Sequence, residues 1–283
     1  MKTRVLTGII AFLILIPFIV FSDTLLFPIG IATCALIAVW EALHCVGLHK
    51  NLWLLIPYGL VALAAPFSIR YLGPDETLMA AVAAVLLLLL YTYAVCVFAR
   101  GKINIADACG GFATALYAIG GFCALIYLHD FHVGGRFLYL LAFIGAWITD
   151  IFAYFSGRLF GKHKLIPEIS PKKTVEGSIG GMLFCVLAFL GFTYVYNTWL
   201  VGFLPEVTIP EMTTTLSYPL MAIVGFVVSI VSQIGDLSMS ALKRHYGIKD
   251  FGKIFPGHGG MLDRFDSVLA VSITLACALG MLL

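Results

Sequence analysis

Residues 77–99 read TLMAAVAAVLLLLLYTYAVCVFA, a run without a single charged side chain. About 20 apolar residues in a helix cross the hydrocarbon core of a bilayer, so this run predicts a transmembrane helix. The rest of the chain has the same character, because 61% of its 283 residues are apolar and only 11% are charged, against about 25% charged in soluble domains. The composition excludes a water-soluble globule and predicts an all-α polytopic membrane protein.

Nine runs are long enough to span a bilayer. They lie at about 5–21, 26–45, 52–69, 77–99, 110–128, 136–156, 178–200, 217–241 and 265–283. The first run follows a short basic start and resembles a signal peptide, but no small-residue cleavage site follows it. We therefore interpret it as a retained helix, the first of about nine.

The distribution of basic residues predicts the orientation of these helices. In the nine-helix arrangement, 15 of the 17 Lys and Arg residues lie on one side, and only Arg70 and Arg136 lie on the other. Cytoplasmic loops carry an excess of Lys and Arg. We therefore expect a cytoplasmic N-terminus, an external C-terminus and two long basic loops in the cytoplasm.

Charge and cysteine content exclude other classes of function. The formal net charge is only +2, so no overall positive field indicates a nucleic-acid partner. The seven cysteines form neither a CxxC motif nor a Cys/His pair at zinc spacing, which argues against a disulfide scaffold or a zinc site. Ionisable residues are concentrated after Asp150. We predict that 1–135 forms structural transmembrane helices and that 136–283 forms the catalytic region.

One polar segment between two predicted helices has an unusual composition. Residues 240–266 read SALKRHYGIKDFGKIFPGHGGMLDRFD. Glycines in a turn leave backbone N–H groups open to close approach, which suits phosphate oxygens. A solvated, positive-inside loop is the alternative, and for Lys249 or Lys253 alone the two readings carry even weight. That alternative requires neither the Gly-rich turn nor the acids at the helix ends.

Carboxylates near this segment predict a metal site. Asp236 lies inside an apolar run, where an unpaired charge costs at least about 2.5–3.5 kcal/mol at mid-bilayer. Helical spacing places Asp236, Ser240 and Lys243 on one face, and Asp263 and Asp266 on another. A Mg²⁺ ion held by one or two carboxylates and substrate phosphates would resolve their repulsion. The alternative is that Asp236 and Asp263 form ion pairs with nearby basic residues, Lys243 and Arg264.

A second cluster follows the sixth predicted span. Asp150 lies within one or two helical turns of the cytoplasmic face, and Lys172 and Lys173 precede the next span. The two lysines, with the hydroxyl of Thr174 beside them, could hold a polyphosphate, while Glu176 would cap the following helix. For two isolated lysines, a role in membrane topology is the simpler alternative.

These motifs resemble the phosphatidate cytidylyltransferase family, also called the CDP-diacylglycerol synthases. The family pattern S-x-x-K-R-x4-K-D-x-G-x-x-(I/L/F)-P-x-H-G-G-x-x-D-R-x-D is met at every fixed position from Ser240 to Asp266. The resemblance extends upstream to 170–177, with the sequence SPKKTVEG, and covers the second half of the chain. Met239 and Val175 depart from the residues that are common in the family, which puts only local packing or a peripheral polar contact in doubt.

The resemblance implies a reaction of CTP with phosphatidate at the membrane, and it implies roles for particular residues. Asp236 and Asp263 would be Mg²⁺ ligands, with Asp266 and Asp150 as further carboxylates and a second cation nearby. The implied phosphate ligands are Lys172, Lys173, Lys243, Arg244, Lys249 and Arg264. The implied substrate site also contains Thr174, Ser240, Asp250, Gly257, His258, Gly259 and Gly260.

The implied partners are CTP, phosphatidate and the lipid bilayer, without nucleic acid, and a homodimer is one option for assembly. The expected location is a bacterial cytoplasmic membrane, with the active site facing the cytoplasm. Within the same class, a related lipid cytidylyltransferase or a polyprenol kinase would share this arrangement. From another class, a cation-coupled transporter could also bury acids in the membrane. The Gly-rich basic loop favours an enzyme, because a transporter needs no cytoplasmic phosphate ligands.

Overall fold

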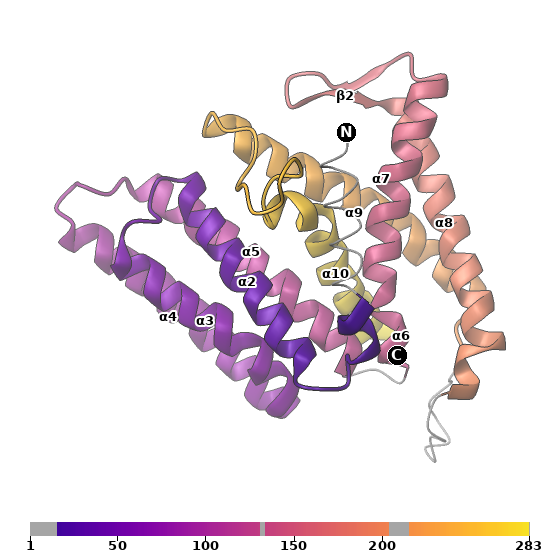
Figure 1. Ribbon diagram of the computed structural model, residues 1–283, viewed down its shortest axis with the longest axis horizontal. Coiled ribbons are helices and arrows are strands. Elements are labelled where there is room, and N and C mark those ends of the chain that lie inside the picture. Colours follow the sequence, from indigo (N-terminus) through magenta and orange to yellow (C-terminus); the bar gives the residue numbers. More distant parts are fainter. Residues whose placement is uncertain (1–15, 131–133, 204–214, 283) are drawn as a thin grey trace. The chain divides into compact units, whose positions relative to one another are not determined.

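Long apolar helices make up most of the protein. The computed structural model describes residues 16–130, 134–203 and 215–282 (Figure 1). The helices are α2 (Leu26–Cys45), α3 (Leu52–Tyr71), α4 (Pro74–Phe98), α5 (Ile105–Asp130), α6 (Gly135–Leu138), α7 (Leu140–Phe160), α8 (Val175–Thr198), α9 (Tyr218–His245) and α10 (Leu262–Leu282). Two short strands, β1 (Lys164–Ile166) and β2 (Ser170–Thr174), and a 3-10 turn (Leu200–Phe203) complete the described elements.

Seven of the described helical segments are long and apolar enough to cross a membrane. They correspond to the expected spans from 26–45 to 217–241, and α10 corresponds to the expected span at 265–283 but is not among the seven. The first expected span, 5–21, lies mostly outside the described residues. The helical membrane architecture is therefore supported, whereas the count of nine and the orientation remain predictions.

The chain packs as two compact units. Among the described residues, unit 1 contains 16–126 and 243–265, and unit 2 contains those within 127–242 and 266–282. This division concerns packing, and the predicted functional division after residue 135 stays a prediction. It shows that the Gly-rich loop packs with the N-terminal helices, although these are remote in sequence.

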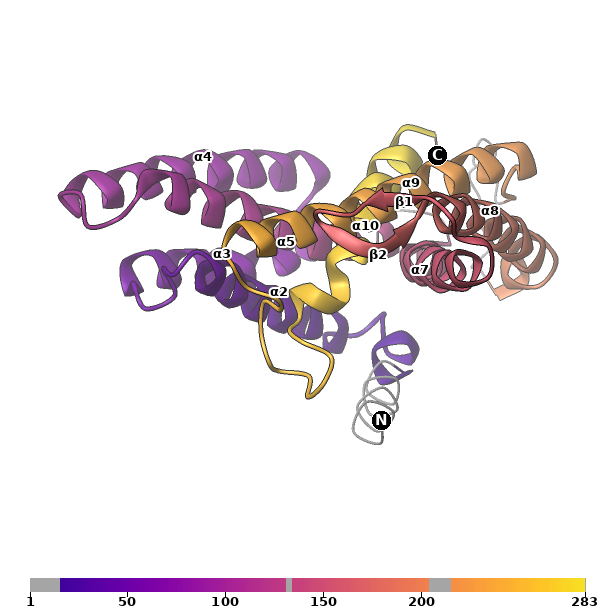
Figure 2. The same ribbon diagram turned by 90° about the horizontal axis from the view of Figure 1, so that it is seen from above.

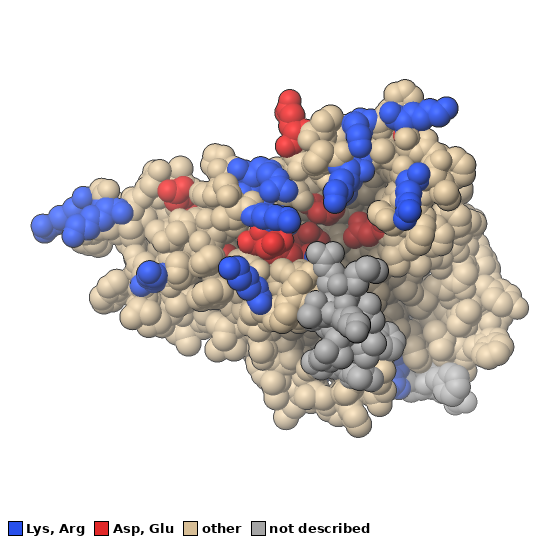
Figure 3. All heavy atoms as spheres, turned by 45° about the horizontal axis from the view of Figure 1, so that its top comes forward, with Lys and Arg blue, Asp and Glu red and all other residues tan. Residues whose placement is uncertain are grey.

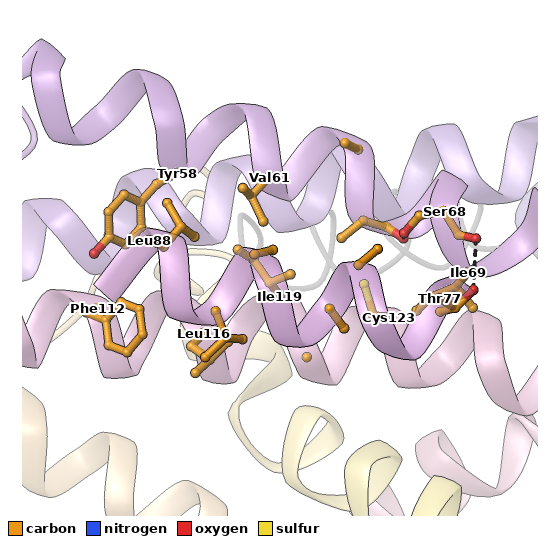
Figure 4. A pocket seen from close by; sticks show the side chains of 17 residues that line it. Tyr58, Val61, Ser68, Ile69, Thr77, Leu88, Phe112, Leu116, Ile119 and Cys123 are labelled. Carbon is orange, nitrogen blue, oxygen red and sulfur yellow. Dashed lines mark hydrogen bonds between the residues drawn. The ribbon is translucent and has the colours of Figure 1, made fainter. Parts of the chain in front are cut away.

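Helices α2, α3 and α4 pack side by side in unit 1 (Figures 1 and 2). The buried hydroxyls of Tyr58 and Thr92 form a 2.6 Å hydrogen bond that joins α3 to α4. A pocket of about 300 Å³ lies between α3, α4 and α5. Its labelled walls include Val61, Leu116 and Ile119, and the residues that line it carry no formal charge (Figure 4). Because no basic side chain lines it, this pocket has no cation that could bind a phosphate.

Helices α7 and α8 run side by side in unit 2 (Figures 1 and 2). Glycines on α8 permit this close approach, as small residues do between membrane helices. A Cβ atom on Gly177 would lie 2.5 Å from the Ala153 carbonyl oxygen, and one on Gly181 would lie 2.9 Å from that of Thr149. The contact fixes the end of α7 against the start of α8.

The connection between α7 and α8 contains structure that the sequence analysis did not predict. Strands β1 and β2 form an antiparallel hairpin in which Lys164 pairs with Thr174 and Ile166 pairs with Ser170. The hairpin lies at the end of α7 and the start of α8 (Figure 1). A segment expected to be a basic loop is therefore a platform that holds its lysines at defined positions.

Candidate active site

Unit 2 contains a pocket of about 470 Å³ that we call the hairpin pocket. Its walls come from α7, the hairpin, the start of α8 and α9. The lining residues are Asp150, Ala153, Tyr154, Gly157, Arg158, Lys164, Leu165, Lys172, Lys173, Thr174, Gly177, Ser178, Gln233 and Asp236. The pocket therefore joins the predicted residues Asp150, Lys172, Lys173, Thr174 and Asp236.

An ion pair between two predicted site residues lies in this pocket. The Lys173 ammonium is 2.6 Å from a carboxylate oxygen of Asp236, and about a quarter of each side chain is exposed. Within the described part of the chain, the buried Nζ atom of Lys173 forms no hydrogen bond of regular geometry. The second Asp236 oxygen accepts a 3.3 Å hydrogen bond from Ser240. The charges are paired, yet the ammonium retains N–H donors for a ligand.

Asp150 and Asp266 are linked through one serine of α10. The Ser267 hydroxyl donates to Asp150 at 3.3 Å, and the Ser267 backbone N–H donates to Asp266 at 2.8 Å. Asp266 is buried. Through Ser267, these contacts bring two of the predicted carboxylates close together within unit 2.

The start of α8 organises the hairpin. The Thr174 side chain is the N-cap and accepts a 3.1 Å hydrogen bond from the Gly177 N–H. Glu176 accepts hydrogen bonds from the backbone N–H groups of Lys162 and His163, at 3.1 and 3.2 Å. The N-cap residue is therefore Thr174 rather than Glu176, although the Glu176 carboxylate also interacts with its own backbone N–H in the first turn. Glu176 also ties the segment after α7 to α8.

In unit 1, Asp263 closes the Gly-rich loop. One oxygen accepts from Lys243 at 2.7 Å, and the other accepts from the backbone N–H groups of Phe251 and Gly260 at 2.7 and 2.9 Å. Asp263 therefore forms an ion pair with Lys243, and its role as a metal ligand stays a prediction. Gly259 has φ +87°, and a Cβ atom there would lie 2.8 Å from Asp263. The turn therefore requires glycine at this position both for its backbone angle and for space.

Glu41 is a buried acid that the sequence analysis did not place beside the Gly-rich loop. Its side chain, on α2, is fully buried. Its two oxygens accept hydrogen bonds from the backbone N–H groups of Met261 and Leu262, at 2.9 and 2.8 Å. A Cβ atom on Gly252 or Gly260 would collide with the same carboxylate. Glu41 thus caps α10 from another helix, in line with the attraction of carboxylates to helix N-termini.

A signal for Glu41 was present in the sequence. It is an acid inside an apolar run, and ionisable residues in such runs usually have a specific partner or function. The sequence alone indicates an acid that reaches the membrane surface or pairs with Lys50, because the observed partners lie about 220 positions away in the chain. The interpretation as a snorkelling or Lys50-paired residue is wrong.

The Gly-rich loop surrounds a pocket of about 640 Å³ in unit 1, which we call the loop pocket. The lining residues are Lys249, Asp250, Gly252, Lys253, Phe255, Pro256, Gly257, His258, Gly259 and Arg264. The Nδ1 atom of His258 is buried and has no hydrogen-bond partner among the residues that the structure describes. The predicted site residue Arg244 does not line this pocket, and its guanidinium donates a 3.4 Å hydrogen bond to the carbonyl oxygen of Ile248. An orphaned polar atom among basic residues is the arrangement that a polar ligand would complete.

The predicted metal ligands fall in different units and have different surroundings. Asp236 offers a partly exposed carboxylate, whereas both oxygens of Asp263 are engaged by nearby donors. In the described ranges, no group of three or more His, Cys, Asp or Glu residues could hold a metal ion. Mg²⁺ needs only one or two protein carboxylates when substrate phosphates and waters complete its shell. The donor set around Asp236 is compatible with such a site.

Charged side chains of both signs reach the face shown in Figure 3, and most of the remaining visible surface is uncharged. This combination fits a membrane protein that binds charged ligands at one surface.

Comparison with known proteins assigns the chain to a family. A model of the cytidylyltransferase family matches residues 2–282. A phosphatidate cytidylyltransferase of Staphylococcus haemolyticus is 35% identical over 273 residues, which cover 96% of each chain. Proteins of the same name from Staphylococcus saprophyticus and Staphylococcus aureus are 34% and 35% identical, again over 96% of each chain. The protein is therefore an integral membrane enzyme, and the chain belongs to the phosphatidate cytidylyltransferases of the cytidylyltransferase family.

Proposed function

We propose that the protein transfers the cytidylyl group of CTP to phosphatidate, giving CDP-diacylglycerol and pyrophosphate. An oxygen of the lipid phosphate attacks the α-phosphorus of CTP, and the bond from that phosphorus to the bridging oxygen of the β-phosphate breaks. The electron pair of the broken bond leaves with pyrophosphate. The observation that carries the proposal is the pairing of Lys173 with Asp236 in a pocket lined by further basic side chains.

The proposed reaction depends more on the neutralisation of phosphate charge than on proton transfer. The second pKa of a phosphate monoester is about 6, so at neutral pH the nucleophile is already ionised and needs no general base. Two polyanions must approach each other, and fixed cations stabilise the charge on the leaving pyrophosphate. Lys172 and Lys173 in the hairpin pocket, and Lys249 and Arg264 in the loop pocket, are placed to bind phosphate oxygens.

The proposal includes Mg²⁺ as cofactor. Asp236 is the ligand that the geometry favours, because one oxygen contacts Lys173 and the other accepts the weak bond from Ser240. Asp263 could contribute only through the oxygen that also contacts Lys243. When bound, Mg²⁺ would neutralise phosphate charge. Lys173 would then hold the Asp236 carboxylate in unit 2, and Lys243 would hold the Asp263 carboxylate in unit 1.

The test of the function and its cofactor uses the purified protein in detergent. With phosphatidate, CTP and Mg²⁺, we expect CDP-diacylglycerol and pyrophosphate in equal amounts, measured by mass spectrometry and a coupled pyrophosphate assay. Excess chelator should abolish both products and added Mg²⁺ should restore them. Full activity in chelator would refute the metal requirement.

We also propose that the site faces the cytoplasm, on the basis of the excess of basic residues on that side. In a Cys-free variant, single cysteines at Lys164 and Lys253 should resist thiol reagents that cannot cross the membrane, whereas one at Glu206, outside the described residues, should react. Labelling of the cysteines at positions 164 and 253 from outside would contradict the proposed orientation.

A further inference from the structure

We propose that the hairpin pocket binds the phosphate group of the lipid substrate, with Arg158 and Lys164 as phosphate ligands. This inference rests on the proposed function and deepens it, because it assigns one of the two substrates to one pocket. Neither residue belongs to the motifs that carry the family resemblance.

The charge of the hairpin pocket matches a phosphate monoester. Its lining includes four basic residues, Arg158, Lys164, Lys172 and Lys173, and two acids, Asp150 and Asp236. Among the side chains alone, before any Mg²⁺ binds at Asp236, two positive charges therefore remain when every acid is balanced by one cation. A phosphate monoester carries up to two negative charges at neutral pH. Because Lys173 already contacts Asp236 at 2.6 Å, the excess positive charge is supplied by the other three basic residues.

The hairpin fixes where this charge is presented. Lys164 is on β1, and its backbone pairs with Thr174 at the end of β2. Arg158 is on the last turn of α7, and its guanidinium lies 3.4 Å from the Tyr154 hydroxyl. Both basic side chains are exposed. They therefore form an exposed rim of the pocket, open to an incoming anion.

The surroundings of the rim favour a lipid over a soluble nucleotide. Tyr154 lines the pocket and is also exposed, and it belongs to a helix that is apolar enough to span the membrane. The neighbouring residues on α7 are large, apolar and exposed, namely Phe155, Leu159 and Phe160. Tyrosine is enriched where acyl chains give way to headgroups. A diacyl lipid could thus keep its chains beside α7 while its phosphate contacts Arg158 and Lys164.

The loop pocket has the opposite character. Most of its lining comes from the segment between α9 and α10, outside the seven candidate membrane spans, and this lining is rich in glycine and charged residues. Exposed backbone N–H groups and basic side chains suit a water-soluble polyphosphate. The alternative, that the hairpin pocket binds the triphosphate of CTP, is therefore an outcome of the test.

Steady-state kinetics in mixed micelles separates the two substrates. We expect Arg158→Gln and Lys164→Gln each to raise the KM for phosphatidate about tenfold, the loss of one charge-assisted hydrogen bond, while the KM for CTP stays within about twofold. Lys162→Gln is the matched control, because its exposed side chain does not line the pocket. It should leave both constants unchanged.

Two kinetic results would overturn the inference. A rise in the KM for CTP without a rise for phosphatidate would assign the pocket to the nucleotide. Values equal to those of Lys162→Gln would show that the two residues contact neither substrate.

A binding measurement keeps this inference separate from the proposed function. Dioctanoyl phosphatidate, without CTP, should raise the melting temperature of the wild type and of Lys162→Gln, but not of the Arg158→Gln/Lys164→Gln double variant. Inorganic phosphate and dioctanoyl phosphatidylcholine should have little effect. Equal stabilisation of all three proteins by phosphatidate would refute the lipid site. If the wild type binds phosphatidate in this way but makes no CDP-diacylglycerol, the proposed reaction fails and the lipid site stands.

Discussion

Asp236→Asn is expected to lower kcat/KM about a thousandfold, the upper range for removal of one charged contributor to a preorganised site. The amide keeps the shape of the side chain but removes the charge that pairs with Lys173 at 2.6 Å and that would hold Mg²⁺. Lys173 would be left as an uncompensated, largely buried charge. Activity is measured as CDP-diacylglycerol formed over a range of Mg²⁺ concentrations.

Glu168→Gln is the matched control for this substitution. Glu168 is an exposed acid in the connection between β1 and β2 and does not line the hairpin pocket. The Glu168→Gln substitution removes the same charge from the same unit, and the activity of this variant should remain close to that of the wild type. Near-normal turnover of Asp236→Asn would remove Asp236 from the catalytic machinery, whatever the effect of the control.

Glu41→Ala is expected to lower kcat about a hundredfold, although Glu41 is placed to contact neither substrate. The change leaves the backbone N–H groups of Met261 and Leu262 buried and unpaired, at a cost of about 1–3 kcal/mol for each. The first turn of α10, which carries Asp263 and Arg264, would shift. A misplacement of about 1 Å can cost about a hundredfold in rate. That result would identify Glu41 as a positioning residue.

A double-mutant cycle with Gly260 distinguishes positioning from general instability. The nearest atoms to a Cβ on Gly260 all belong to the Glu41 carboxylate, and its backbone does not require positive φ. Gly260→Ala should therefore be severe in the wild type and nearly neutral in the Glu41→Ala background, a coupling expected only of residues in contact. Gly257→Ala, at φ +77°, should be equally harmful in both backgrounds. If Gly260→Ala costs the same in both, the proposed contact does not operate.

Hydropathy predicted the membrane helices well because their signal is local. The expected run at 26–45 coincides with α2, and 77–99 falls within a few residues of α4. The predicted span at 136–156 is interrupted at Tyr139, where α6 ends and α7 begins. The break alters the hydrogen-bond pattern of one turn, while Tyr139 keeps helical backbone angles and 135–160 forms one candidate span, so a hydropathy pattern does not reveal it.

The hairpin escaped prediction because its strands are too short for a periodic pattern. β1 has three residues, and β2 has five, of which one is Pro171 and two are lysines. This composition is typical of a loop. Pairing across the turn, rather than intrinsic preference, makes these residues extended.

Residue types indicated which side chains belong to the candidate site, but their partners depended on the fold. The sequence offered Lys243, at helical spacing, only as an ion-pair alternative to metal for Asp236, whereas Lys173 on the hairpin is the ion-pair partner observed. Lys243 instead contacts Asp263. Contacts between residues that are 63 positions apart, as Lys173 and Asp236 are, leave no trace in a single sequence. The motif identified the participants, and only the structure assigned the pairs.

The most direct measurement of the central claim follows two phosphorus labels of CTP. Purified protein with phosphatidate and Mg²⁺ should move the label of the α-phosphate into the lipid product and release the label of the γ-phosphate in pyrophosphate, while Asp236→Asn should do neither. That distribution is the signature of cytidylyl transfer. Transfer of the γ-label into lipid would identify a lipid kinase, and no α-label in lipid at saturating CTP would contradict the account.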